Sequence, residues 1–118
     1  MSERLALHLD RMLESAIQVA EYVHGMAREG FLADRKTQQA VVLNLMVIGE
    51  TVNRLHDDGA DFLARHPALP WGAMRGMRNR IAHGYFDIDM AIVWETVQRD
   101  LPPLVAQLTA LRAVGDGD

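Results

Sequence analysis

The 118-residue chain contains no cysteine and a single lysine, Lys36. The lack of cysteine excludes a disulfide scaffold, a thiolate zinc site and a cysteine nucleophile, and it fits a reducing cytoplasm. Long apolar runs are also missing: the longest, residues 40–48, is interrupted by Asn44 and is too short to span a bilayer. The first residues do not have the form of a signal peptide. We therefore expect a cytoplasmic protein with no membrane segment.

Positive charge is also scarce. Sixteen acidic residues stand against twelve basic ones, giving a formal net charge of −4. This balance argues against a protein that coats nucleic acid through a broad basic face, although it leaves room for a small basic site. The Gly-rich phosphate loop and the His-Glu-x-x-His metal motif are absent too. Four histidines show no metal-ligand spacing and are interpreted as surface or helix-end residues: His8, His24, His56 and His66.

Apolar residues recur at spacings of three and four along nearly the whole chain, which predicts helices. The main predicted helices cover residues 3–27, about 35–57 with Asp34 as N-cap, 71–83 with Gly84 as the stop, and a last stretch capped by Asp89. The second helix is apolar almost all round, so it belongs in the middle of a bundle or at a subunit contact. A buried strand is the alternative there, but no second strand exists to pair with it.

The remaining segments are predicted as connectors or breaks. Residues 57–70 are expected to form a connector with a short helix over 60–65, and Pro102-Pro103 should bend or break the last helix. The predicted architecture is all-α: an antiparallel up-and-down bundle of four main helices with one further short helix. It forms a single domain over residues 1–114, followed by a disordered tail at 115–118.

The segment from Trp71 to Tyr85 departs from a simple amphipathic pattern. At about 100° per residue, one arc should face the core, and it contains Trp71, Met74, Met77, Ile81 and Ala82. Arg78 falls inside this apolar arc, whereas Arg80 points away from it. A polar flank collects Arg75, Asn79 and His83.

An arginine on an apolar arc needs a partner for its five donors. One interpretation is structural: Arg78 pairs with Glu50 and locks two helices, while His83 caps the helix end. The other is a site in which Arg78 binds an anion, His83 moves a proton, and Asn79 and Tyr85 line the pocket. Arg78 and His83 are roughly 140° apart on an ideal helix, so they converge poorly within one chain. A two-fold axis between two copies would improve the convergence.

The stretch Arg78-Asn-Arg-Ile-Ala-His83-Gly-Tyr85 resembles the Arg-x4-His-x-Tyr motif of the HEPN superfamily, specifically HepT-like ribonuclease toxins. Further segments resemble the same family in the same order, over about residues 5–112. They are residues 34–38, 48–50, 69–71, 76–79, 83–86 and 92–97. The departures are Ala82, Asp87 and the doubled proline at 102–103, none of which removes a motif residue.

The resemblance implies a HEPN helical bundle acting as a homodimer, with metal-independent RNA cleavage and no cofactor. It implies Arg78 and His83 as the catalytic pair, with Asn79 as an accessory polar residue. Tyr85 would receive AMP from a nucleotidyltransferase antitoxin. We add Glu50 and Arg75 as accessory site residues from their positions on the helices. The alternative function is a non-catalytic HEPN module that binds a nucleotide or the transferase.

Overall fold

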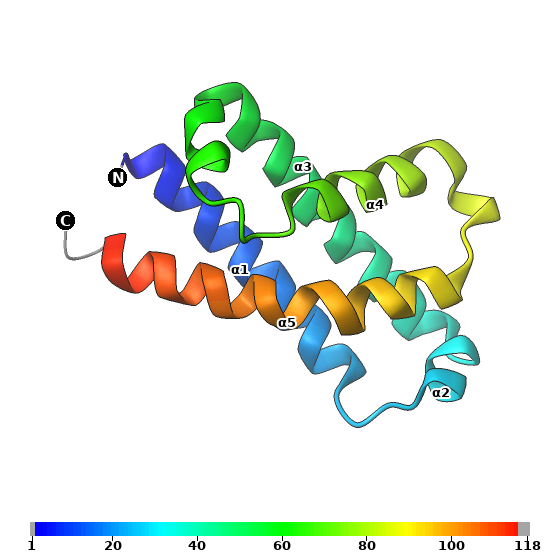
Figure 1. Cartoon of the computed structure of the whole chain (residues 1–118). Helices are drawn as coiled ribbons and strands as arrows, with labels where there is room; N and C mark the ends of the chain where they lie inside the picture. Colours follow the sequence, from blue (N-terminus) through cyan, green and yellow to red (C-terminus); the bar gives the residue numbers. More distant parts are fainter. Residues whose placement is uncertain (1, 116–118) are drawn as a thin grey trace.

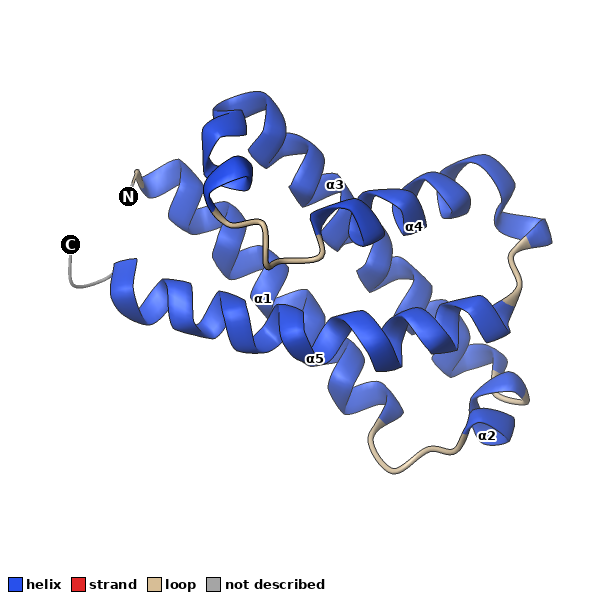
Figure 2. Ribbon diagram, viewed as in Figure 1, coloured by secondary structure: helices blue, strands red, loops and turns tan. Residues whose placement is uncertain are grey.

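The structure is a computed structural model that describes residues 2–115. Figure 2 shows that its regular elements are helical throughout that range. In chain order they are α1 (Glu3–Val23), α2 (Arg28–Leu32), α3 (Arg35–Arg65), α4 (Trp71–Gly84), the 3-10 helix η1 (Tyr85–Asp87) and α5 (Met90–Gly115). The prediction of an all-α chain with four main helices is confirmed.

The four main helices form a bundle in which successive long helices run in opposite directions (Figure 1). Helix α1 packs against both α3 and α5, and α4 lies along α3 with only slight contact to α5. The helix with the Arg-x4-His-x-Tyr motif is therefore held mainly by one neighbour, α3.

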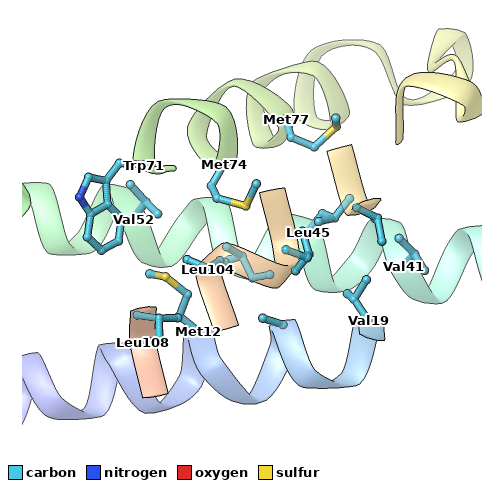
Figure 3. Packing of buried hydrophobic residues seen from close by; sticks show 14 of the residues in the cluster. Met12, Val19, Val41, Leu45, Val52, Trp71, Met74, Met77, Leu104 and Leu108 are labelled. Atoms are coloured by element: carbon cyan, nitrogen blue, oxygen red, sulfur yellow. The ribbon is translucent and has the colours of Figure 1, made fainter. Parts of the chain in front are cut away.

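The core lies where the apolar faces of all four long helices meet, and Figure 3 shows part of it. Its buried side chains include Met12 and Val19 of α1, Val41, Leu45 and Val52 of α3, Trp71, Met74 and Met77 of α4, and Leu104 and Leu108 of α5. Because α4 contributes three of these side chains, one face of the motif helix is fixed by apolar burial.

One predicted helix limit needs correction at the first connection, and one helix there was not predicted. Helix α1 ends at Val23 rather than at residue 27, because Gly25 takes a positive φ of 76° that ends the helix. The short helix α2 that follows was not predicted, since its five residues are too few to show a period. Asp34 caps α3 as expected: its Oδ1 accepts from the Thr37 backbone N–H at 3.0 Å.

The middle of the chain also differs from the prediction. Residues 57–65 are not a connector, because α3 continues to Arg65 across a kink at Gly59 (φ −175°, ψ 74°). The predicted short helix over 60–65 is thus the last part of α3. Only residues 66–70 connect α3 to α4.

A bend or a break is predicted near Leu101; helix α5 continues through Pro102 and Pro103, so the helix is not broken there. Both prolines are exposed, whereas Leu101 and Leu104 on either side are buried. Burial of these leucines holds the two halves of the helix against the same core. The predicted tail at 115–118 falls outside the described residues except for Gly115, which ends α5.

Candidate functional site

The buried face of α4 follows the predicted arc, with one exception. Trp71, Met74, Met77 and Ile81 are buried, but Ala82 is exposed. Ala82 lies at the edge of the arc, and its small side chain gains little from burial. The apolar arc is therefore narrower than predicted, and the exposed face of the motif helix is correspondingly wider.

Arg78 lies where α4 crosses α3 most closely. A Cβ atom placed on Gly49 would come within 2.2 Å of the Arg78 Cβ and 2.8 Å of the Met74 carbonyl oxygen. Only a glycine at position 49 permits this approach, because any side chain there would push the two helices apart. The base of the Arg78 side chain is thus fixed against the backbone of α3.

The guanidinium of Arg78 is held by two side chains. Its Nε donates to Glu50 Oε1, and its Nη1 donates to Asn79 Oδ1 at 3.2 Å. The Arg78 side chain is 26% exposed and that of Glu50 is 40% exposed, so the pair lies at the surface rather than in the core. The predicted Arg78–Glu50 pair is confirmed, and the remaining Nη2 donors make no hydrogen bond to any described residue.

A second arginine of α4, one turn before Arg78, also donates a hydrogen bond to a side chain of α3. Arg75 Nε donates to Asn53 Oδ1 of α3 at 2.9 Å, and both Arg75 and Asn79 are exposed. The surface where α3 meets α4 therefore carries two guanidinium groups, Arg75 and Arg78. One carboxylate, Glu50, lies between the helices beside them.

His83 lies on a different side of α4 from Arg78. It lies in the last turn, is exposed, and donates no hydrogen bond to a described residue, so the capping bond considered from the sequence is not formed. With Arg80 it lines a cavity of about 350 Å³ between the end of α4 and the start of α5. The other walls of this cavity include Met77, Asp87, Ile88 and Ile92. Arg78 does not line it, so one protomer does not bring Arg78 and His83 together in a shared pocket.

Two exposed aromatic rings follow His83 after one intervening residue, Gly84. Tyr85 and Phe86 lie in η1 with ring centroids 5.6 Å apart and planes inclined by 16°. Tyr85 is 41% exposed, and the Phe86 side chain is fully exposed. The turn is anchored at its far end by Asp89, whose Oδ1 accepts from the Ala91 backbone N–H at 2.9 Å as the cap of α5.

One histidine was interpreted wrongly from the sequence. His8 is buried, not at the surface, and its Nε2 lies 3.0 Å from Asp58 Oδ2 of α3. This contact, followed by the charge of Arg4, lowers the pKa of Asp58 below its ordinary value. The only sequence signal for this burial is the position of His8 four residues before Met12, on the apolar face of α1. The 50 residues between His8 and Asp58 hide the pairing.

Two kinds of feature are absent from residues 2–115. No group of three or more His, Asp or Glu side chains in that range is arranged to hold a metal ion. Likewise, none of the helices in that range combines the length and apolarity needed to cross a bilayer.

Comparison with known proteins defines the class of this bundle. The family model described as "HepT-like: Ribonuclease HepT-like" matches residues 12–111, and the chain therefore belongs to the HepT-like ribonuclease family. The match includes the whole of α3 and α4, which carry Glu50, Arg78 and His83. No solved structure gives a significant match.

Curated relatives support the same family. The chain is 35% identical over 105 residues to the "Probable ribonuclease HepT" of Thermococcus cleftensis, covering 89% of this chain and 93% of the relative. It is 36% identical over 91 residues to a "Putative RNase" of Methanocaldococcus jannaschii, covering 77% and 73%. A third relative, a "Putative RNase" of Caldanaerobacter subterraneus subsp. tengcongensis, is 33% identical over 101 residues, covering 86% and 88%.

Proposed function

We propose that the chain is a metal-independent endoribonuclease toxin whose active site is completed by a second copy of the chain. Arg78 and His83 are its catalytic residues. The observation that carries this proposal is the state of Arg78, whose guanidinium is fixed by Glu50 and Asn79 at the surface and retains Nη2 donors. Family membership supplies the substrate class, RNA.

The chemistry needs few groups because RNA carries its own nucleophile, the 2′-hydroxyl. The 2′-oxygen forms a bond to phosphorus while the 5′-oxygen leaves, which yields a 2′,3′-cyclic phosphate and a 5′-hydroxyl. An imidazole takes the 2′-hydroxyl proton and a second one protonates the leaving oxygen. A guanidinium fork stabilises the charge on the phosphoryl oxygens.

The positions of Arg78 and His83 favour a site shared between two copies. In one protomer they lie on different sides of α4, and of the two only His83 lines the cavity at the end of the helix. A two-fold arrangement supplies two imidazoles and two guanidinium groups on opposite sides of one phosphate. The outer face of α3 beside Glu50 offers apolar surface for such a contact, since Leu43 is 64% exposed and Val47 is 38% exposed.

The accessory residues have separate roles in this proposal. Glu50 and Asn79 orient the Arg78 guanidinium and act as positioning residues. Arg75 adds positive charge one turn from Arg78, which attracts RNA although the whole chain carries a net charge of −4.

Tyr85 is the proposed site of control by a nucleotidyltransferase antitoxin. Its ring is 41% exposed and lies two residues after His83, so another protein can reach it. The Tyr85 oxygen would bond to the α-phosphorus of ATP as pyrophosphate leaves, which places AMP on the tyrosine. The added bulk and negative charge beside His83 would then keep the RNA phosphate out.

The ribonuclease proposal is tested with purified protein and single-stranded RNA in the presence of EDTA. We expect cleavage with 2′,3′-cyclic phosphate ends, lost in Arg78→Ala and in His83→Ala. Arg28→Ala and His56→Ala are matched controls, because both residues are about half exposed and lie away from the motif. Folded Arg78→Ala and His83→Ala proteins that cleave as fast as the parent would exclude these residues. A parent that leaves RNA intact would favour the alternative, a non-catalytic binding module.

The modification proposal has its own test. Incubation with the nucleotidyltransferase and ATP should raise the mass of the chain in steps of one AMP, with loss of RNA cleavage. Tyr85→Phe should show no such step, and Tyr22→Phe, which removes another part-exposed tyrosine, should modify normally. AMP found on the Tyr85→Phe protein would show that another residue is the site of modification.

A further inference from the structure

The aromatic pair at the end of the motif helix is not explained by packing within the chain. Phe86 is fully exposed, whereas the other two phenylalanines, Phe31 and Phe62, are buried. Leaving a phenyl ring in water forfeits the free energy that its burial would supply. Packing within the protomer therefore does not explain why a phenylalanine stands at position 86.

The two rings are also ordered with respect to each other. Tyr85 and Phe86 lie nearly parallel, at 16°, with centroids 5.6 Å apart, which is the offset-stacked geometry of aromatic pairs. They belong to a 3-10 turn between α4 and α5, in which the Ile88 backbone N–H bonds the Tyr85 carbonyl. The Tyr85 ring lies parallel to the Phe86 ring without covering it, so the Phe86 ring presents its flat face to solvent.

The charge of the chain indicates what this face would bind. With a net charge of −4, the chain as a whole does not attract phosphates, so binding of RNA needs local groups. Proteins that bind unpaired RNA strands add affinity by stacking bases on exposed aromatic rings. The turn begins two residues after His83, so a base stacked there would belong to a nucleotide close to the cleaved bond.

We propose that Phe86, with the Tyr85 ring parallel to it, is a stacking platform for an unpaired base of the RNA substrate, and that it determines affinity for single-stranded RNA. This inference rests on the proposed ribonuclease function and adds a subsite to it. A planar π-face is required, so any aromatic residue serves at position 86 and an aliphatic residue of similar size does not.

The experiment measures binding separately from cleavage. The probe is a ten-nucleotide single-stranded RNA with 2′-O-methyl groups, which lacks the nucleophile, and with 2-aminopurine as a fluorescent base. Parent, Phe86→Leu and Phe86→Trp proteins are titrated with it. We expect Phe86→Leu to bind about tenfold more weakly and to lose the fluorescence quenching caused by stacking. Phe86→Trp should keep both, and Leu7→Ala, a change at another exposed apolar residue, should bind as the parent does.

Two results would overturn the platform. Phe86→Leu protein that binds the probe as tightly as the parent would show that no stacking occurs there. A changed oligomeric state of Phe86→Leu in sedimentation would assign the ring to a protein contact instead. The matched RNA with 2′-hydroxyl groups separates this from the ribonuclease proposal. Cleavage by the parent and equally by Phe86→Leu removes only the platform, while no cleavage and no probe binding by the parent removes both.

Discussion

Gly49 of α3 and Arg78 of α4 lie so close together that there is no room for a side chain on Gly49. A Cβ at Gly49 would lie 2.2 Å from the Arg78 Cβ. The close crossing decides where the guanidinium can reach. Because the Arg78 side chain starts on the surface of α3, its Nε meets Glu50, the next residue along that helix. The Arg78–Glu50 ion pair therefore depends on the glycine at position 49.

Gly49→Ala should lower the free energy of unfolding by about 1–3 kcal/mol, because the added methyl meets backbone and Cβ atoms that cannot rotate away. Gly76→Ala is the matched control. It adds the same methyl to the interior of α4, where nothing lies within 4 Å, and should stabilise the helix by about 0.5–1 kcal/mol. Urea denaturation measures both. Equal stability of Gly49→Ala and the parent would contradict the close crossing.

Arg78→Lys should lower kcat/KM for single-stranded RNA by about 100-fold while the protein stays folded. Lysine keeps the positive charge but has no planar fork, so it cannot bond Glu50 and Asn79 and also offer paired donors to a phosphate. Arg28→Lys, a change in another part-exposed ion pair, is the control and should cleave normally. Full activity of Arg78→Lys would reduce the role of Arg78 to charge alone.

Glu50→Gln should preserve the shape of the pH–rate profile, because a positioning residue does not exchange a proton in the reaction. The amide oxygen can still accept from Arg78 Nε, so kcat/KM should fall by less than about tenfold and Glu50→Ala should lose more. Stability should change by less than about 1 kcal/mol, since the pair is partly exposed. Loss of a limb of the pH–rate profile in Glu50→Gln would make Glu50 an acid or base.

The pairing of His8 with Asp58 predicts how stability depends on acid. The pKa of Asp58 in the folded state is lowered by the His8 contact and by Arg4, so the unfolded chain binds the proton more readily. This contribution to stability is present above the ordinary pKa of 3.8 and is lost as the pH falls through the lower folded value. Asp58→Asn should flatten the decline of unfolding free energy below pH 4, while Asp57→Asn should leave it unchanged. An identical acid limb in Asp58→Asn would exclude the linkage.

Pro103→Ala should raise the free energy of unfolding by roughly 1–2 kcal/mol. The alanine regains a backbone N–H inside α5, and this gain exceeds the entropy that proline removes from the unfolded chain. Pro70→Ala is the control, because Pro70 is the N-cap of α4, where the N–H that proline lacks is not needed for a helical hydrogen bond. Its carbonyl, which accepts from the Met74 N–H at 3.1 Å, is kept in the alanine variant. A destabilised Pro103→Ala would mean that the proline conformation is itself required by the packing of α5.

The sequence was sufficient to predict the helices in which apolar residues recur at helical spacing over many residues. The limits of α4 were predicted almost residue by residue, because Pro70 and Gly84 enclose a clear apolar arc. Pro102-Pro103 were misleading, since the local cost of proline is outweighed by burial of Leu101 and Leu104. The second helix is predicted to end near residue 57, whereas α3 bends at Gly59 and continues to Arg65.

The candidate site was predicted only in part. The Arg78–Glu50 pair followed from the cost of leaving an arginine unpaired on an apolar arc. The cavity that His83 shares with Arg80 could not be predicted, because it depends on how the start of α5 returns past the end of α4. The exposure of Phe86 was missed for the same reason, since an aromatic residue in a turn gives no period that shows which way it faces.

The attachment of α4 to essentially one neighbour has a consequence for movement. Helix α1 packs against both α3 and α5, whereas α4 packs almost entirely on α3. In the stretch from Arg80 to Asp87 only Ile81 is buried, so this stretch is expected to open more readily than α3. Amide hydrogen exchange would register this as faster exchange in that stretch than in α3, and a bound partner would slow it.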